Sequence, residues 1–486
     1  MISIFGNEST KTCSGINRRE FLRVGGLALG GLSAASMLAG QASASTGSSA
    51  FKDKSVVLLF LQGGPPQIET FDPKPNQPAN NRSCTGFVQT RLPGVQFGGT
   101  FPRLAQMADR LAIVRSFGSG DASHNQVPVL TGNNRMRAPM GALMARALGG
   151  NVNPRTGVPT NIVVIPEAIR PELQLGQPTG GFTIQDVLGQ YIPAGSLGSN
   201  FEAFLPAGGG TLMRNLQLRM DRNRFEDRRQ LLSQVDGLRR RLDSAPGDLG
   251  SLDAFQRQAH EVLLQSVASA FDISREDPRV IERYDTSRYF VMEDYHRGGP
   301  NFNNLVNQSR ATNLLGKQML LARRLCEAGA GFVTVIDSCW DFHADGNNPG
   351  VPAGMSFLGP QADHAIAAFL EDVQQRGLSD KILLIVTGEM GRTTNKGGNR
   401  GGTDHWGDLT PLLIAGGGLR MGQVIGESDR PGGRAISRPY WPVNLLTTVL
   451  HTLFDASEVR INPALLPAEI ATLMNNGAPP ITELFS

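Results

Sequence analysis

The chain has 486 residues, of which 40% are hydrophobic and 18% charged, so it can bury a large core and is not a disordered polypeptide. Its formal net charge is only +3, and most of that charge lies near the N-terminus, so no general basic field for nucleic acid remains. The 58 glycines and 30 prolines predict many loops between the regular elements.

The N-terminal leader, residues 1–44, has the features of an export signal. Arg18-Arg19 followed by x-Phe-Leu precedes a short run rich in glycine and alanine, and Ala42-Ser43-Ala44 offers a small-residue cleavage site. The paired arginines resemble a twin-arginine signal, which implies the twin-arginine export machinery as a partner and a periplasmic or extracellular location. A membrane anchor is the alternative, but the run is short for a span of ~20 apolar residues.

Short apolar runs bounded by glycine, proline or polar residues predict buried strands along the mature chain. In chain order these runs are Lys54–Leu61, Ala112–Ser116, Thr160–Pro166, Gly331–Ile336, Ile382–Val386 and Pro411–Ala415. Amphipathic spacing predicts helices at Phe101–Leu111, Ala311–Ala328, Pro360–Arg376 and Val443–Phe454. This alternation predicts an α/β fold with a mostly parallel central sheet and helices on both faces.

A charged, mainly helical insertion at about residues 211–310 interrupts the alternation. Apolar residues recur at helical spacing from Asn215 to Leu242, and a second helix is expected at Leu252–Phe271. The arginines between the apolar positions are typical of a solvated helix face rather than of a nucleic-acid site. We therefore expect one α/β domain over residues 45–486 that includes this insertion.

Carboxylate and imidazole side chains follow three of the predicted strands. Because the carboxyl ends of parallel strands meet at one edge of a sheet, side chains distant in sequence can converge there. Two histidines with carboxylates suit zinc, whereas a site richer in oxygen suits calcium or magnesium. The predicted metal ligands are Asp341, His343, Glu389 and His405, with Glu69, Asp72, His124 and Asp404 as further candidates.

These groups are expected to form one pocket. Asp341, His343 and His405 should cluster, and Glu389 should line the same pocket because one crossover helix joins the two strands that precede these residues. We expect Trp406 to form a wall of the pocket and the loop Gly397–Gly402 to form its lip. The alternative for the stretch after residue 386 is a surface loop with incidental charges.

Seven sequence blocks support a family resemblance. They are GGPPQIETFDPKP (63–75), LTGN (130–133), LLARRLCEAGAGFVTV (320–335), CWDFH (339–343), TGEMGRT (387–393), GTDHWGD (402–408) and GQVIGESD (422–429). In this order they resemble the bacterial domain-of-unknown-function 1501 family, which is grouped with the alkaline-phosphatase-like and sulfatase-like hydrolases. The resemblance implies a large α/β sandwich with a metal site at the strand ends. It also matches Asp341, His343, Glu389 and His405 to the family's W-D-x-H, G-E-x-G-R and D-H-W blocks.

The chain departs from the wider superfamily at three places. Gln62 stands where a carboxylate commonly ends the first strand, and Glu389-Met390 stands where the superfamily has an Asp-His pair, so one metal position is expected to be weak or absent. Sulfatases use a modified cysteine shortly before a Thr-Gly pair. Here Ala122 and Ser123 occupy that place, which disfavours sulfatase chemistry and leaves a serine nucleophile.

Two functions follow from these residues. The first is an exported, metal-dependent hydrolase of phosphate or sulfate esters, acting on a small anionic ester or on a sulfated or phosphorylated glycan. In that enzyme Ser123 is the candidate nucleophile, and Arg392 or Arg400 holds the anion. The second is a non-catalytic exported binding or assembly protein that keeps the fold with a degraded metal site.

Overall fold

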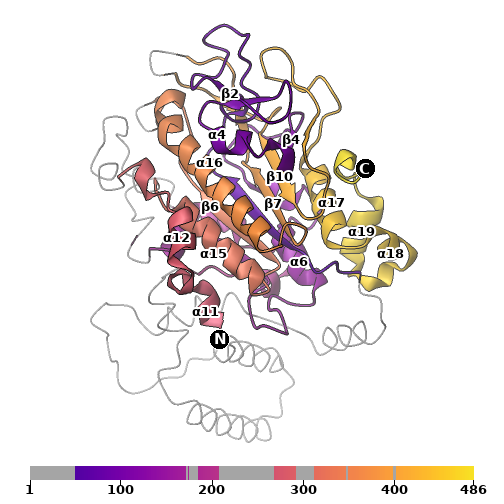
Figure 1. Ribbon diagram of the computed structural model, residues 1–486. Coiled ribbons are helices and arrows are strands. Elements are labelled where there is room, and N and C mark those ends of the chain that lie inside the picture. The colour runs from indigo at the N-terminus through magenta and orange to yellow at the C-terminus, as the bar shows by residue number, and fades with distance from the viewer. Residues whose placement is uncertain are drawn as a thin grey trace, which may run out of the picture.

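The computed structural model describes the greater part of the chain (Figure 1). The described residues are 50–170, 173, 184–206, 267–291, 311–345, 348–397 and 401–486. The leader, most of the predicted helical insertion and Arg400 lie outside the described residues. Among the helices that are described, none combines the length and the apolar character needed to cross a membrane.

The centre of the fold is a seven-stranded sheet with the order β11-β4-β10-β7-β1-β6-β5. Its strands are β1 (Ser55–Leu61), β4 (Ala112–Val114), β5 (Asn161–Val164), β6 (Phe332–Asp337), β7 (Ile382–Thr387), β10 (Leu412–Gly416) and β11 (Gln423–Ile425). All neighbouring pairs are parallel except those made by β10, which runs antiparallel to both β4 and β7. The predicted mostly parallel sheet is therefore confirmed.

Helices cover both faces of the sheet (Figure 1). The long helices are α15 (Leu315–Glu327), α16 (Val351–Gln375) and α17 (Pro442–Leu453). The shorter ones are α3 (Gln67–Thr70), α4 (Pro102–Ala105), α5 (Val127–Thr131), α6 (Met140–Ala147), α7 (Ile184–Tyr191), α11 (Val267–Phe271), α12 (Pro278–Arg283), α18 (Ala456–Ile461) and α19 (Ala468–Asn476). Two-stranded ladders join β2 (Phe87–Gln89) to β3 (Gln96–Gly98) and β8 (Gly391–Arg392) to β9 (His405–Trp406).

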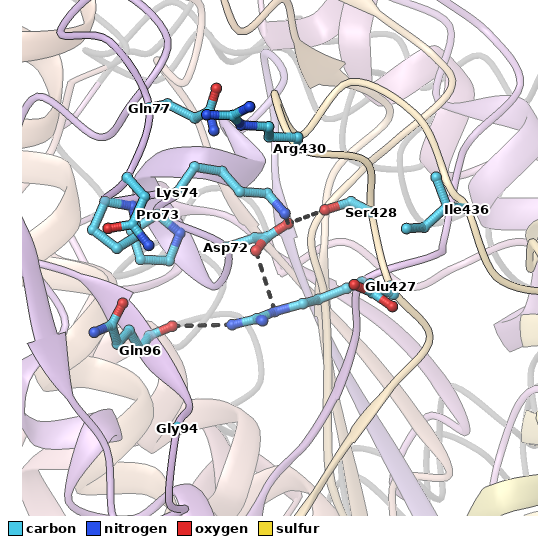
Figure 2. A pocket seen from close by; sticks show the side chains of 13 residues that line it. Asp72, Pro73, Lys74, Gln77, Gly94, Gln96, Glu427, Ser428, Arg430 and Ile436 are labelled. Carbon is cyan, nitrogen blue, oxygen red and sulfur yellow. Dashed lines mark hydrogen bonds and ion pairs between the residues drawn. The ribbon is translucent and has the colours of Figure 1, made fainter.

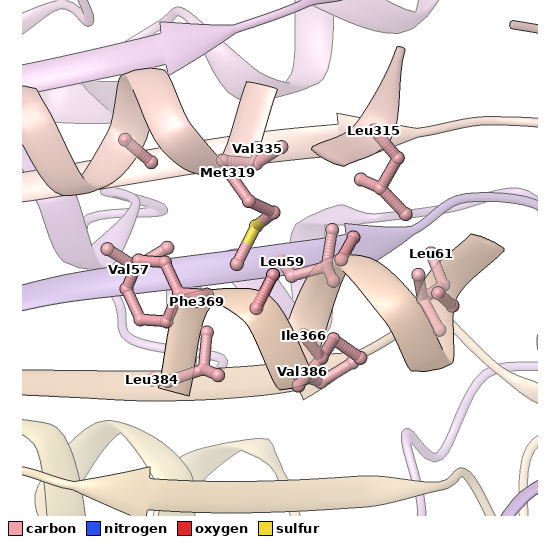
Figure 3. Close-up of a cluster of buried hydrophobic side chains, with 14 of the residues drawn as sticks. Val57, Leu59, Leu61, Leu315, Met319, Val335, Ile366, Phe369, Leu384 and Val386 are labelled. Carbon is pink, nitrogen blue, oxygen red and sulfur yellow. The ribbon is translucent and has the colours of Figure 1, made fainter. Parts of the chain in front are cut away.

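The alternation of side chains along β1 builds both halves of the core. Val57, Leu59 and Leu61 point to the face covered by α15 and α16, where they pack with Met319 and Phe369 (Figure 3). The intervening side chains of β1 point to the other face and pack with residues of α6 and α17. Full burial of each such aliphatic side chain contributes roughly 1.5–3 kcal/mol, so the central strand is a main source of stability.

Two predicted helices have different bounds in the structure. The predicted helix Phe101–Leu111 is a short α4 followed by a 3-10 turn at Ala108–Arg110. The predicted helix at Pro360–Arg376 starts earlier, at Val351, and carries Pro360 in its interior. A proline normally marks a helix start, which explains the late boundary expected from the sequence.

A network of ion pairs fastens the described segment 267–291 to the sheet-covering helices. Glu276 accepts from Arg323 at 2.6 Å, from Arg324 at 2.9 Å and from Arg376 at 2.9 Å. The side chain of Arg323 is only 1% exposed, and its Nε also contacts Asp372 at 2.8 Å. Removing one member of such a buried set would leave its partners without compensation.

Glu276→Gln should make the free energy of unfolding less sensitive to acid. Burial alone would raise the pKa of Glu276, but the bonds from Arg323 and Arg324 and the charge of Arg376 lower it from 4.5 to about 2. The carboxylate therefore contributes its full stability above pH 4.5, and that contribution is lost as the pH falls through about 2. Denaturant titrations at a series of pH values over this range measure the difference.

The matched control is Glu282→Gln, because Glu282 is an exposed carboxylate on the same segment. This control should follow the wild-type acid profile. A Glu276→Gln variant with the same acid dependence as the wild type would contradict the assignment of the network.

Candidate metal centre

The candidate site lies at the carboxyl edge of the sheet. Parallel strands β1, β6 and β7 end there and lead to Gly63, to Asp341 and to Glu389. The segment after β4 reaches the same edge and delivers His124, because β4 runs in the same direction as β7 through the antiparallel β10.

Four side chains converge closely enough to hold one metal ion. They are His124, Asp341, His343 and His405, and each offers one ligand atom within 4.8 Å of the others. The Nε2 atoms of His343 and His405 are 2.8 Å apart. The carboxylate of Asp341 lies 3.1 Å from Nε2 of His343, 3.6 Å from Nε2 of His405 and 3.3 Å from Nε2 of His124. A tetrahedral zinc site with ligands at ~2.0–2.1 Å has ligand-to-ligand distances of about 3.3–3.4 Å, so the donor set fits zinc.

The opposite ring nitrogen of two of the three histidines lies within hydrogen-bond distance of an acceptor. Nδ1 of His124 is 3.3 Å from Oε1 of Glu389, and Nδ1 of His405 is 3.2 Å from the carbonyl oxygen of Ala122. Nδ1 of His343 lies 4.0 Å from Asp404. Metal-binding histidines typically donate their second nitrogen to a carboxylate or carbonyl in this way, which leaves Nε2 unprotonated and directed at the metal.

Glu389 lies behind His124 rather than among the four converging groups. Its side chain is fully buried, and it accepts the backbone N–H of Gly63 at 2.9 Å through Oε1 and 3.1 Å through Oε2. The sequence predicted Glu389 as a ligand and His124 as an additional candidate. The geometry instead brings His124 into the inner group and gives Glu389 the role of orienting it.

The inner group is strongly coupled electrostatically. Burial would raise the pKa of Asp341, but hydrogen bonds from His124, His343 and His405 and the charge of Arg392 hold it well below its usual range. Burial would lower the pKa of His124, but its bonds to Asp341 and Glu389 outweigh burial and raise it to about 9. Asp341 is therefore an anion around which the three imidazoles gather.

Arg392 is a positioning residue in this structure. Its side chain is 0% exposed and contacts Asp341 through Nη2. Its Nε donates to the carbonyl of Gly64 at 3.0 Å and its Nη1 to the carbonyl of Thr403 at 3.3 Å. In this structure the guanidinium is occupied by contacts within the protein, and the anion-binding role of Arg392 stays a prediction.

The backbone of Arg392 is held as firmly as its side chain. Gln67 accepts from its N–H at 3.0 Å and donates to its carbonyl at 2.8 Å. In the β8–β9 ladder Arg392 pairs with His405, so this short pairing sets the position of the histidine. Gln67 was not singled out from the sequence, because its role depends on contacts with a segment more than three hundred residues away.

Gly63 allows the β1 turn to pass directly beneath the loop that carries Asp341. Its φ of +122° lies in a region that residues with a side chain rarely adopt. A Cβ built there would lie 2.6 Å from the backbone nitrogen of Asp341 and 2.7 Å from the carbonyl carbon of Trp340. The site therefore depends on a residue without a side chain at this position.

Ser123 lies between two residues that contact the metal centre. Ala122 before it accepts from His405, and His124 after it belongs to the inner group. The Ser123 hydroxyl is exposed and donates to Oδ1 of Asp121 at 2.5 Å. An exposed hydroxyl bonded to a carboxylate can act as a nucleophile whose proton has an acceptor in place.

The other candidate ligands lie in separate networks. Glu69 is fully buried and accepts from Ser83 at 2.7 Å and from the backbone of Cys84 at 2.9 Å. Asp72 contacts Lys74 at 3.1 Å and Arg115 at 3.5 Å. Neither carboxylate belongs to the metal-competent cluster found among the described residues.

The remaining features of the predicted pocket are partly described. Trp406 follows His405 and donates to the carbonyl of Gly433 at 2.6 Å, which ties it to a neighbouring loop. Gly397 and Gly402 pair with each other across the expected lip, whereas residues 398–400 lie outside the described part of the chain. Gly402 packs against the backbone of His343, since a Cβ there would lie 2.2 Å from its carbonyl oxygen.

The fold and the cluster together define a large α/β protein with a candidate metal centre at the carboxyl edge of its sheet. The chain belongs to the family described as protein of unknown function (DUF1501), whose model matches residues 53–463. This confirms the resemblance expected from the seven sequence blocks. No curated protein gives a significant match to the sequence.

Three solved bacterial structures illustrate the similarity that the structure search found. A sulfatase, PsFucS1 from Pseudoalteromonas sp., has a TM-score of 0.31 and 12% identity, covering 84% of this chain and 73% of its own. The phosphonate monoester hydrolase of Agrobacterium radiobacter has a TM-score of 0.26 and 15% identity, covering 82% and 73%. A protein in the alkaline phosphatase superfamily from Vibrio parahaemolyticus has a TM-score of 0.25 and 12% identity, covering 88% and 76%. At these scores we draw no functional argument from the similarity.

Proposed function

We propose that this chain is an exported, metal-dependent hydrolase of phosphate or sulfate esters. The observation that carries the proposal is the arrangement of three imidazoles around Asp341, with the second nitrogens of His124 and His405 each within hydrogen-bond distance of an acceptor. Such an arrangement costs desolvation and like-charge crowding when empty, and a divalent cation removes both costs.

Zinc is the cation that suits these ligands best. Three imidazole nitrogens and one carboxylate oxygen are a typical zinc donor set, whereas calcium takes six to eight oxygen ligands. Gln62 adds no carboxylate to the site, because it is an amide whose oxygen accepts from Ser338 at 2.9 Å. We therefore propose one zinc ion held by His124, Asp341, His343 and His405.

A cation that took the ester oxygen as a further ligand, beside the four side chains or in place of one of them, would supply Lewis-acid polarisation of that oxygen. Ser123 would attack the phosphorus or sulfur of the ester, and its proton would pass to Asp121, to which the hydroxyl already donates. The bond from phosphorus or sulfur to the alcohol oxygen would break, and Asp121 would return the proton to that oxygen. Water would then hydrolyse the phosphoserine or sulfoserine, which releases phosphate or sulfate and restores the hydroxyl. Arg392 would hold Asp341 and the glycine turn in place. Arg400 stays the candidate for holding the substrate anion, and it lies outside the described residues.

The proposed substrate is a small anionic ester or a sulfated or phosphorylated glycan, and we propose no nucleic-acid partner. The near-neutral charge of the chain supports the second point. Export through the twin-arginine machinery to the periplasm or the cell exterior is proposed from Arg18-Arg19 and the apolar run that follows. Proteins that use this route are generally exported folded, often with the cofactor bound.

Ser123→Ala should lower the turnover of a hydrolysed ester by about 100-fold or more while leaving the zinc content unchanged. The measurement is a screen of phosphate, phosphonate and sulfate esters with zinc-loaded protein, followed by kcat for any ester that is hydrolysed. A fall in kcat without loss of zinc would separate the nucleophile from the metal ligands.

Ser274→Ala is the matched control, because Ser274 makes the same contact with a preceding aspartate, Asp272, at 2.6 Å but lies far along the chain from the site. It should keep wild-type turnover. If the zinc-loaded chain hydrolyses none of the esters, the non-catalytic binding or assembly protein becomes the better description.

A further inference from the structure

A second hollow opens at the same edge of the sheet, over the ends of β4 and β11 (Figure 2). Its volume of about 510 Å³ falls within the roughly 300–1,000 Å³ typical of small-molecule sites. β4 and β11 are parallel to each other, and β4 runs in the direction of β7, so the hollow and the metal centre share one rim.

At the floor of the hollow one carboxylate is paired with two cations, which leaves the floor with one excess positive charge. Asp72 is 7% exposed and bonds with Lys74, Arg115 and Ser428. Arg115 also donates to the carbonyl of Phe71 at 2.7 Å. These groups are held by one another and by the backbone, so an anion would have to compete with Asp72 for the two cations.

The groups at the rim are different, because their polar atoms have no protein partner within the described part of the chain. They are the amides of Gln77 and Gln96, the guanidinium of Arg430 and the carboxylate of Glu427. Figure 2 shows these residues at the sides of the hollow, with Asp72 between them. One cation, one anion and two amides make a neutral set of donors and acceptors. Such a set matches vicinal hydroxyl groups, each of which both donates and accepts.

Apolar surface completes the lining. Pro73 and Pro75 lie on one side, and Ile436, which is 62% exposed, lies on the other. An exposed aliphatic side chain beside unpaired polar groups suits a ligand with a hydroxylated edge and a C–H face. A pyranose ring has both, whereas inorganic sulfate or phosphate has neither.

We propose that this hollow is a subsite for a neutral sugar unit of the substrate. The inference rests on the proposed hydrolase function and makes the substrate an ester carried on a glycan. The subsite would bind a sugar next to the unit that bears the ester, and its contribution would be positioning rather than chemistry.

One segment connects the subsite to the metal centre. Glu427, Arg430 and Ile436 face the hollow, and the segment is closed by a bridge between Ser428 and Ala435. At its tip the carbonyl of Gly432 accepts from Gln67 at 3.0 Å, and that of Gly433 accepts from Trp406 at 2.6 Å. Gln67 also bonds to the backbone of Arg392, and Trp406 follows His405 in the chain. One residue, Gln67 or Trp406, therefore connects the segment at the hollow to a residue of the metal centre in each case.

The test is sugar binding by the full mature chain in the presence of a chelator, so that no turnover can occur. The probes are neutral tetrasaccharides of glucose, galactose and mannose, the sulfated forms of the same sugars, and sodium sulfate alone. We expect isothermal titration to detect at least one neutral tetrasaccharide. Arg430→Ala should weaken that binding about tenfold or more, the loss expected for a hydrogen bond to a charged group.

Arg434→Ala is the matched control, since Arg434 lies on the same segment without lining the hollow. It should bind the sugar as the wild type does, and both variants should bind zinc normally. Absence of binding to every neutral sugar, equal binding by Arg430→Ala, or full competition by sulfate alone would overturn the subsite. Zinc titration and ester turnover are measured separately, so failure of the subsite and failure of the hydrolase proposal give different results.

Discussion

His405→Ala should weaken zinc binding by about 100-fold or more, as measured by isothermal titration and by metal content after dialysis. The substitution removes one of three imidazoles and the Nε2 atom that lies 2.8 Å from that of His343. Because zinc binds the folded chain, the wild type should also gain thermal stability on zinc addition, and the variant should lose most of that gain.

Two further variants test whether the loss of zinc affinity is specific to the proposed ligands and to the residue that orients one of them. His451→Ala alters a histidine on α17 whose Nε2 lies 3.4 Å from the carbonyl of Met474, and it should leave zinc affinity unchanged. Glu389→Gln keeps the shape of the residue behind His124 but weakens its acceptor, and it should cost about 10–100-fold in affinity. Zinc affinity that is equal in wild type and His405→Ala would exclude the proposed ligand set.

Gly63→Ala should lower the free energy of unfolding by about 3 kcal/mol or more and abolish the metal centre. The positive φ alone costs about 1–3 kcal/mol for a residue with a side chain. The new methyl group would also press on the backbone of Trp340 and Asp341, and overpacking of that kind costs about 1–3 kcal/mol. Denaturant unfolding combined with zinc titration measures both effects.

Gly86→Ala is the control that separates the cost of a positive φ from the cost of a steric clash with neighbouring backbone. Gly86 has φ +78°, yet a Cβ there meets nothing within 4 Å, so its substitution should cost only the strain and leave zinc binding intact. Similar losses for the two alanine variants would show that contact with the Asp341 loop does not matter.

The sequence predicted the strands of the sheet well, because buried strands are continuous apolar runs with clear ends. Ile382–Val386 was expected and β7 is Ile382–Thr387. The antiparallel orientation of β10 could not be predicted from the sequence, because an apolar run such as PLLIA does not indicate the direction of its strand within the sheet. β8 and β9 have two residues each, which is too short for any periodicity.

The candidate site was harder to predict than the sheet. The rule that parallel strands end at one edge was enough to bring Asp341, His343 and His405 together, and the structure places them so. It could not rank His124 above Glu389, because both follow strands that reach this edge. The difference arises from the turn at Gly63, whose N–H holds the Glu389 carboxylate behind the histidine.

The position of β1 at the middle of the sheet has a consequence for synthesis of the chain. β1 is made early, but its two partners pair with it at Phe332 and at Ile382. At ~5–20 residues per second, a ribosome takes roughly 15–65 s to produce the second partner after the first strand. Until β6 is made, the run VVLLFL has no native neighbour in the sheet, and one of its edges stays unpaired until β7 follows, so it is an aggregation-prone segment. Shielding of β1 by a chaperone until β7 has emerged would therefore reduce aggregation of nascent chains.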